Sequence, residues 1–339
     1  MTLTSHATHT KRAFLGTELV DAVDRFPCPI EDDQDFVGTR IDLGTLVRLA
    51  RTAKRGAIDY LIVDDTLAGN PPFSGRRRDA LEAMHLAVKL APAAQGVRIA
   101  PRVHSGWVEP IRLLSSLVGL ELAAAGRTAW QLDMPDHTQS RTRGPEMLAA
   151  IVEDVWSADK PKTGLAAIAR AHRARRIREG NCVRHRWAPD DAGPLLLIRA
   201  SSSEAVRVGA QHADVIRISA ANPEQAKQQR SRILAAAEHE GRNPDAVFVA
   251  VDLAICLNSV EANAAERADL IESITSRPLG GEGARYVGTP AGLAETMVQW
   301  LEGGSCDGFT FLPASLPIDL VLAVDRAIPE LRSQGWAEQ

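Results

Sequence analysis

The residues best suited to chemistry in this chain of 339 residues follow short apolar segments. Three serines at 201–203 come directly after one such segment and precede a helix-like stretch that carries Arg207. A helix N-terminus offers unpaired N–H groups and a partial positive charge, which suits a phosphate, and Arg207 could add a charge-assisted contact. The same pattern is typical of an ordinary helix N-cap, and the spacing alone favours the cap.

Polar side chains also stand at the ends of three other apolar segments. These side chains are Asp64 and Asp65, His104 and Ser105, and Gln131 and Asp133. A carboxylate pair could act as a base, bind a metal or hydrogen-bond a heterocycle, and a histidine can exchange a proton near neutral pH. Each also fits a structural role, as a turn former, a helix cap or a hydrogen-bonded histidine. The chain has no G-x-S-x-G, HExxH or P-loop sequence, so hydrolase, zinc-protease and NTPase functions lack support.

The elements that must position these residues alternate along the chain. Strand-like segments are predicted at 13–15, 60–63, 97–103, 128–132, 195–198, 215–218, 247–257 and 309–312, and helices at 46–53, 80–90, 109–125, 147–156, 202–213, 223–239, 260–274 and 318–331. Continuous apolar strands separated by helices indicate a parallel sheet covered on its outside. The number of units favours an α/β fold of the (β/α)8 TIM barrel type over an open doubly wound sheet, and no G-x-G-x-x-G follows a strand. Ligands of such barrels bind at the carboxyl ends of the strands, where the polar residues stand.

The stretch 288–313, GTPAGLAETMVQWLEGGSCDGFTFLP, is the most clearly delimited unit. Pro290 is favoured at the first position of a helix, Gly303 and Gly304 would end that helix, and Asp307-Gly308 would turn the chain into a short strand. The preceding segment 275–287, SRPLGGEGARYVG, is interpreted as a flexible Gly-rich loop that could cover the mouth of a barrel.

We expect a flexible N-terminus at 1–12 and a single barrel domain at 13–335. The charge and composition of the chain then limit the partners and sites that it could have. The net charge of -4 gives no reason to expect a nucleic-acid partner. No apolar run approaches the roughly 20 residues that span a bilayer, so we expect no membrane partner and a cytoplasmic location. The four cysteines form no CxxC pair, and we expect no metal site.

An ordered set of segments resembles the luciferase-like flavin-dependent monooxygenases, in the nitrilotriacetate and dibenzothiophene-sulfone monooxygenase branch. The segments are LVRLARTAKRG with DYL within 46–61, EP at 109–110, Leu120, GR at 126–127, AW at 129–130, ASSSEAVR at 200–207, HAD at 212–214 and the stretch 288–313. The resemblance implies a (β/α)8 barrel, here with shortened insertions. It also implies reduced FMN, supplied by a separate flavin reductase and used with oxygen on a small-molecule substrate. The deazaflavin F420 serves some branches of this family.

The resemblance also assigns site residues and an assembly. Asp65 matches the acidic residue near the isoalloxazine ring, Ser105 lies beside a hydroxyl position, and Gln131 could keep an amide contact. The phosphate-binding positions are Ser202, Ser203 and Arg207, and His104 is the candidate catalytic residue. Family members are commonly homodimers or homotetramers.

Two departures from the family pattern support a second interpretation. The segment 131–134 reads QLDM where the family has N-V-V-T, and the branch's long insertion before G-T-P is missing. These departures favour a non-catalytic barrel that acts as a partner subunit or a ligand-binding protein. An F420-dependent oxidoreductase is the third possibility.

Overall fold

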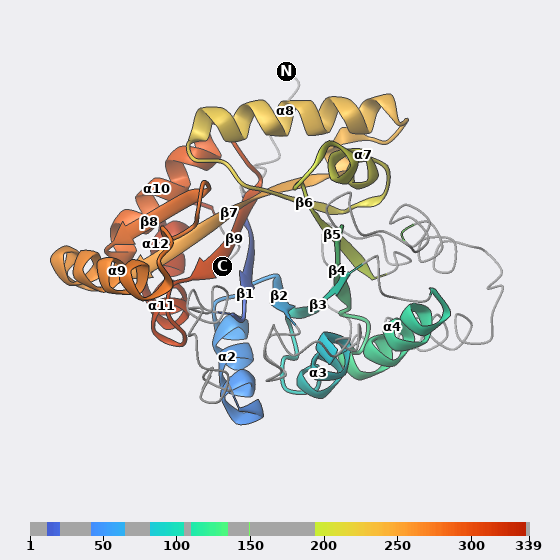
Figure 1. Cartoon of the computed structure of the whole chain (residues 1–339), viewed down its shortest axis with the longest axis horizontal. Helices are drawn as coiled ribbons and strands as arrows, with labels where there is room; N and C mark the ends of the chain where they lie inside the picture. The colour runs from blue at the N-terminus through green and yellow to red at the C-terminus, as the bar shows by residue number, and fades with distance from the viewer. Residues whose placement is uncertain are drawn as a thin grey trace, which may run out of the picture.

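The computed structural model describes residues 12–20, 42–64, 82–104, 110–134, 149 and 194–336. In this part of the chain eight parallel strands close a barrel (Figure 1): β1 Phe14–Glu18, β2 Tyr60–Val63, β3 Arg98–His104, β4 Ala129–Asp133, β5 Leu195–Arg199, β6 Val215–Ile218, β7 Phe248–Leu257 and β9 Gly308–Pro313. Neighbouring strands pair in chain order from β1 to β7, and β9 closes the ring between β7 and β1. The predicted (β/α)8 barrel is confirmed.

Helices surround this barrel (Figure 1). They are α2 Leu43–Arg55, α3 Glu82–Leu90, α4 Pro110–Ala124, α7 Ser203–His212, α8 Pro223–His239, α9 Glu261–Thr275, α10 Pro290–Glu302, α11 Ile318–Leu322 and α12 Ile328–Ser333, with one turn of π-helix, Ala323–Ala327, between the last two. Each predicted helix in the described residues is therefore present. Of the predicted helix 147–156 only position 149 is described, and most of the expected N-terminus at 1–12 lies outside the described residues. No helix in the described ranges has both the length and the apolar character needed to cross a bilayer.

The prediction of a loop over the whole of 275–287 was wrong. A ninth strand, β8 Ala284–Gly288, pairs in parallel with positions 253–257 of β7. The ten residues of β7 run past the end of β6, which pairs only with positions 248–251. The exposed peptide groups of the later half of β7 then need a partner, and β8 supplies one. The glycines suggested a loop, but Gly280 and Gly281, with φ of 80° and 60°, form only the turn that precedes the strand.

The unit 288–313 has the predicted form. Pro290 is the first residue of α10, and the hydroxyl of Thr289 caps the helix by accepting from the Gly292 N–H at 3.3 Å. Gly304 has the left-handed φ of 67° that ends the segment. Gly308 begins β9 where a Cβ atom would stand 1.8 Å from the carbonyl oxygen of Phe14, so only glycine allows β9 to approach β1 this closely.

The barrel interior is apolar at one end and charged at the other. Side chains of a strand alternate between its two faces, so every second residue points into the barrel. The first inward positions carry an apolar cluster: Phe14, Tyr60, Leu195, Leu197, Val215 and Phe248. Farther along the same strands, the inward positions carry charged and amide side chains. The fold therefore gathers its buried charges toward the carboxyl ends of the strands.

Candidate functional site

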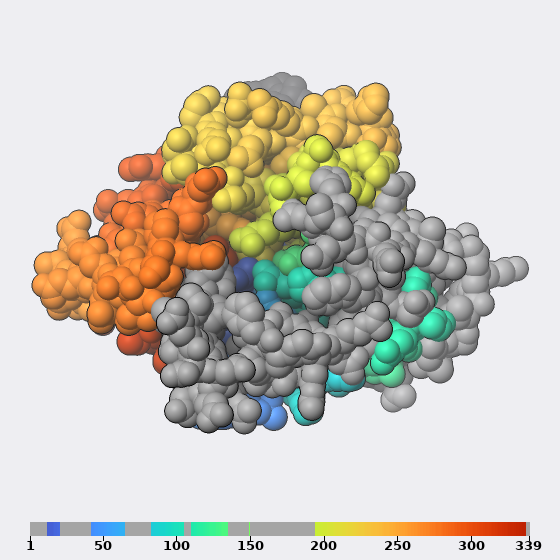
Figure 2. All heavy atoms as spheres, in the orientation of Figure 1, coloured from blue at the N-terminus to red at the C-terminus, as the bar shows by residue number. Residues whose placement is uncertain are grey.

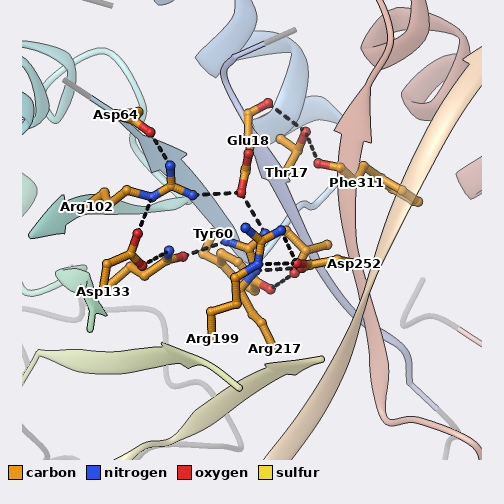
Figure 3. A network of polar contacts seen from close by, with 12 residues as sticks. Thr17, Glu18, Tyr60, Asp64, Arg102, Asp133, Arg199, Arg217, Asp252 and Phe311 are labelled. Atoms are coloured by element: carbon orange, nitrogen blue, oxygen red, sulfur yellow. Dashed lines mark hydrogen bonds and ion pairs between the residues drawn. The ribbon is translucent and has the colours of Figure 1, made fainter. Parts of the chain in front are cut away.

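Eight polar side chains form one connected cluster inside the barrel, which we call the interior network (Figure 3). Its members are Glu18, Asp64, Arg102, Gln131, Asp133, Arg199, Arg217 and Asp252. They come from β1, from the residue after β2, and from β3, β4, β5, β6 and β7. Below the network, the hydroxyls of Tyr60 and Thr310 lie 2.5 Å apart and border the apolar end of the barrel.

Arg217 is the centre of the network on its β6 side. Its side chain is 0% exposed, and each of its three nitrogens has a partner. Nε donates to Oδ1 of Asp252 at 2.7 Å, Nη1 to Oε1 of Gln131 at 2.6 Å, and Nη2 to Oε1 of Glu18 at 2.7 Å. Burial alone would lower the pKa of Arg217, but the charges of Asp252 and Glu18 raise it above its ordinary value. This guanidinium is therefore charged and held rigidly.

Arg102 is the second centre and faces three carboxylates. It donates to Asp64 through Nη1 and to Oε1 of Glu18 through Nη2 at 3.3 Å. Its Nε lies 3.1 Å from Oδ2 of Asp133. Burial would raise the pKa of Asp133, but the charges of Arg102 and His104 and a hydrogen bond from Gln131 hold it below its usual value. The Asp133 carboxylate is therefore ionised at neutral pH.

His104, the candidate catalytic residue, ends β3 next to this carboxylate. It is half-buried and stands opposite Asp133 in the pairing of β3 with β4. A partly exposed imidazole beside an ionised carboxylate is placed to exchange a proton with a bound molecule. His104 thus lies at the carboxyl end of β3, as the sequence predicted, and beside the interior network; its catalytic role stays a prediction.

The amide of Gln131 is engaged on both sides. Its nitrogen donates to Oδ1 of Asp133 at 2.6 Å and its oxygen accepts from Arg217. The side chain is fully buried, so Gln131 orients charged neighbours in this structure. Its predicted contact with a flavin ring stays a prediction. Asp65 and Ser105 lie outside the described residues.

The three residues predicted to bind phosphate lie on the first two turns of α7. Ser202 is the N-cap of this helix, and its hydroxyl accepts from the Ala205 N–H at 3.1 Å. Ser203 is exposed as the first residue of α7, and the exposed Arg207 donates to Oε1 of Gln211 at 3.2 Å. The cap interpretation of Ser202 is confirmed. An exposed hydroxyl at a helix N-terminus fits a phosphate group, whereas the Arg207 guanidinium, on the second turn, is bonded toward the C-terminal end of the helix in this structure.

Sequence reasoning missed most of the interior network. It named Asp64, Gln131 and Asp133, but not Glu18, Arg102, Arg199, Arg217 or Asp252, which lie within the strands. A usable signal was present, because a charge inside a buried strand must be paired, and arginines and carboxylates occur at inward positions of different strands. Within the described residues, no group of three histidine, cysteine or acidic side chains could hold a metal ion.

The molecular face seen in Figure 2 is hollowed near its centre, where atoms of early strands are visible between the later helices and strands. The charged layer of the barrel lies toward the carboxyl ends of the strands, and the start of α7 follows the carboxyl end of β5; this is the ligand-binding end of the fold. The arrangement can therefore hold an anionic group at α7 and a polar molecule above the interior network.

Comparisons with known proteins agree with this architecture. The sequence profile described as "Luciferase-like monooxygenase" matches residues 26–304. The N-acetyl-S-(2-succino)cysteine monooxygenase of Bacillus subtilis (strain 168) is 40% identical over 50 residues, which are 15% of this chain and only 11% of that relative. EDTA monooxygenase (EmoA) from Chelativorans sp. BNC1 has a similar structure, with a TM-score of 0.68 at 15% identity over 97% of this chain and 95% of that chain. The coenzyme F420 dependent tetrahydromethanopterin reductase from Methanopyrus kandleri gives 0.58 at 12% identity over 95% and 99%. These structural likenesses, at such low identity, show a shared fold.

Proposed function

Because this chain belongs to the luciferase-like monooxygenase family, we propose that it is a flavin-dependent monooxygenase. It uses reduced FMN, delivered by a separate flavin reductase, and oxygen to oxygenate a small organic substrate. The observation that carries the proposal is the family match over 26–304 together with a barrel whose strands end in polar side chains beside the exposed start of α7.

The start of α7 would hold the phosphate of FMN. The exposed hydroxyl of Ser203, the helix N-terminus and the guanidinium of Arg207 supply the donors, and Ser202 fixes the helix start as its cap. Reduced FMN supplies the electrons with which oxygen is activated when it is bound, so the protein needs neither a nucleophile nor a metal. The chain's own task is to bind, orient and exclude water.

The interior network would form a rigid floor under the reaction space. Its charges are paired with one another, so they do not need water beneath the substrate. At the edge of this floor, His104 would hold a proton at its imidazole and move it to or from the reacting molecule. Ionised Asp133 would stabilise the protonated imidazole.

A titration with flavins tests the proposal. Oxidised and reduced FMN, riboflavin and F420 are titrated into the full chain, and binding is followed by fluorescence. We expect FMN to bind more tightly than riboflavin, because only FMN carries the phosphate. Replacing Ser203 and Arg207 together by alanine should weaken FMN binding about tenfold or more, the effect of losing charge-assisted hydrogen bonds, and leave riboflavin binding unchanged.

The matched control is Arg232→Gln, which removes one positive charge from an exposed position of α8. This variant should bind FMN like the wild type. Failure of every flavin to bind at millimolar concentration would contradict the proposed function. Tight binding of F420 without FMN binding would favour the F420-dependent oxidoreductase.

A non-catalytic barrel is the second candidate, and a specific observation favours it. Gln131 and Asp133, which stand where the family pattern has N-V-V-T, are engaged with Arg217 and Arg102 instead of being available to a ring. A partner subunit or binding protein needs the scaffold but not the reaction. Oxygen consumption with reduced FMN and a substrate panel separates the two, because the non-catalytic protein would bind without turnover.

The proposal also covers location and assembly. We expect the enzyme to work in the cytoplasm, where a flavin reductase supplies the reduced cofactor, and to form a homodimer or homotetramer. Light scattering coupled to size-exclusion chromatography measures the assembly, and a monomer at micromolar concentration would contradict it.

A further inference from the structure

Arg199 differs from the other two arginines of the interior network in its exposure. Its side chain is 37% exposed, whereas its partner Asp252 is 2% exposed and Arg217 is 0% exposed. Arg199 is the last residue of β5, so it stands at the carboxyl end of the strand, four residues before the start of α7. Its guanidinium therefore lies between the closed floor of the barrel and the outside.

Among the described residues, the hydrogen bonds of Arg199 engage only one edge of its guanidinium. Nε and Nη2 both donate to a single oxygen, Oδ2 of Asp252, at 2.8 and 2.6 Å. A guanidinium has five N–H donors in a planar fork, and this side-on contact uses two of them. The Nη1–Nη2 edge keeps two parallel N–H groups, the geometry that receives a carboxylate in a bidentate pair.

The charges around Arg199 are unevenly distributed across the barrel. On the β5–β6 side, Arg199 and Arg217 share the one carboxylate of Asp252 (Figure 3). On the opposite side Arg102 faces three carboxylates: Glu18, Asp64 and Asp133. Arg217 also binds Glu18, which it shares with Arg102. Among the described residues, Asp64 and Asp133 are thus the carboxylates that contact Arg102 but not Arg217. An anion that enters the barrel mouth is therefore attracted to the partly exposed Arg199 and repelled from the Asp133 side.

We propose that Arg199 is a substrate-binding residue that holds a carboxylate group, so that the substrate is a small organic acid. This inference rests on the proposed function, since it names the substrate class of the same site. The planar fork favours a carboxylate, which offers one oxygen to each of the two N–H groups, over a neutral amide, which has a single acceptor oxygen and carries no charge. The acid would lie with its carboxylate toward β5 and its remaining part toward His104 and Asp133.

Calorimetric titration of the full chain tests this assignment. The probes are acetate, succinate and benzoate, each compared with its uncharged amide, in the presence and absence of saturating oxidised FMN. We expect at least one acid to bind and its amide to bind at least about tenfold more weakly. Arg199→Gln should weaken binding of the acid about 10- to 100-fold, the range for a charge-assisted pair, whereas the control Arg232→Gln should leave it unchanged.

A second variant guards against misfolding. Asp252 keeps its bond from Arg217 when Arg199 is replaced, so Arg199→Gln should fold. Should it not fold, Arg199→Lys decides the question, because lysine keeps the charge beside Asp252 but has no fork. We then expect unchanged thermal stability and weaker binding of the acid. If Arg199→Lys bound the acid as tightly as the wild type does, the proposed bidentate contact would be contradicted.

The remaining outcomes are also decisive. The inference fails if none of the three acids binds the wild type at tens of millimolar, or if Arg199→Gln binds acids as the wild type does. It also fails if Arg199→Gln weakens FMN but not riboflavin, since Arg199 would then contact the flavin phosphate. FMN binding without acid binding overturns this inference alone. Acid binding through Arg199 without any flavin binding supports it and contradicts the proposed function.

Discussion

Two arginines of this barrel are in opposite surroundings, one buried in the interior network and the other exposed on α7. In the interior network, Arg217 is fully buried and is held by Glu18, Gln131 and Asp252 from three other strands. At the start of α7, Arg207 is exposed and donates to Gln211 of its own helix. Arginine is thus part of the buried interior at position 217 and part of the surface at position 207.

The difference shows which charges the fold requires and which contribute little to its stability. A buried charge has lost its hydration, so it must be paired, and removal of one partner leaves the others uncompensated. An exposed charge on a helix surface keeps its hydration and contributes little to stability. We therefore expect substitutions in the interior network to act on folding and substitutions at α7 to act on binding.

The largest expected effect comes from Arg217→Met. Without the guanidinium, the oxygens of Glu18, Gln131 and Asp252 that it contacts lose a buried donor. We expect the free energy of unfolding to fall by about 3–5 kcal/mol, the usual result of removing one partner of a buried ion pair. Urea denaturation followed by circular dichroism measures this. The matched variant Arg207→Met should change stability by less than about 0.5 kcal/mol. Similar losses for the two arginines would remove the distinction between the regions.

A smaller effect is expected from the acid titration of Asp133. Burial opposes its ionisation, but Arg102 and His104 hold the folded-state pKa below the unfolded value of about 3.9. The ionised carboxylate therefore stabilises the protein above that value, and this contribution is lost as pH falls through the lower folded-state pKa. Asp133→Asn should reduce the free energy of unfolding at pH 7 by about 1–3 kcal/mol, the range for hydrogen bonds to charged groups.

The pH profile separates this effect from a simple loss of packing. We expect the difference in the free energy of unfolding between the wild type and Asp133→Asn to become smaller as the pH is lowered below 4. Urea denaturation at each pH measures it. The exposed Asp245 provides the control, because Asp245→Asn should give a curve parallel to that of the wild type. A gap that stays constant down to acid pH would show that the charge of Asp133 is not what stabilises the network.

Most of the fold could be predicted from the sequence because its signals are local. Apolar runs such as 60–63 and 215–218 became strands at the predicted places, and proline and glycine delimited α10. The strand β8 could not be found this way. Its partner is the part of β7 that extends beyond β6, and that geometry depends on the assembled barrel.

The site was predictable only in part, for the same reason. The serines at 202 and 203 could be predicted to begin a helix, because they stand between a strand-like and a helix-like segment. Arg217 and Asp252, in contrast, are single charges in the strands VIRI and FVAVDLAICL, and neither strand reveals its partner. Only the register of the closed barrel brings Arg217 to Asp252 and Gln131. A charge within a buried strand predicts that a polar network exists, but the pairing of strands far apart in the sequence determines its members.

The smallest expected effect separates the two serines at the start of α7. Ser202 caps the helix through its bond to the Ala205 N–H, whereas Ser203 is exposed on the first turn. In the absence of flavin, Ser202→Ala should lower the free energy of unfolding by about 1 kcal/mol, as loss of an N-cap does, and Ser203→Ala by less than about 0.5 kcal/mol. Urea denaturation of the flavin-free protein measures both. A larger loss for Ser203→Ala would contradict the assignment of the cap.

Ser202→Asp then distinguishes the cap from the phosphate contact at one position. Aspartate is as good a cap as serine and favours a helix N-terminus, so the flavin-free protein should keep its stability. Its negative charge would stand where the phosphate binds, so FMN affinity should fall while riboflavin affinity is unchanged. An aspartate variant that binds FMN normally would place the phosphate elsewhere, and the start of α7 would then be structural in the same sense as the interior network.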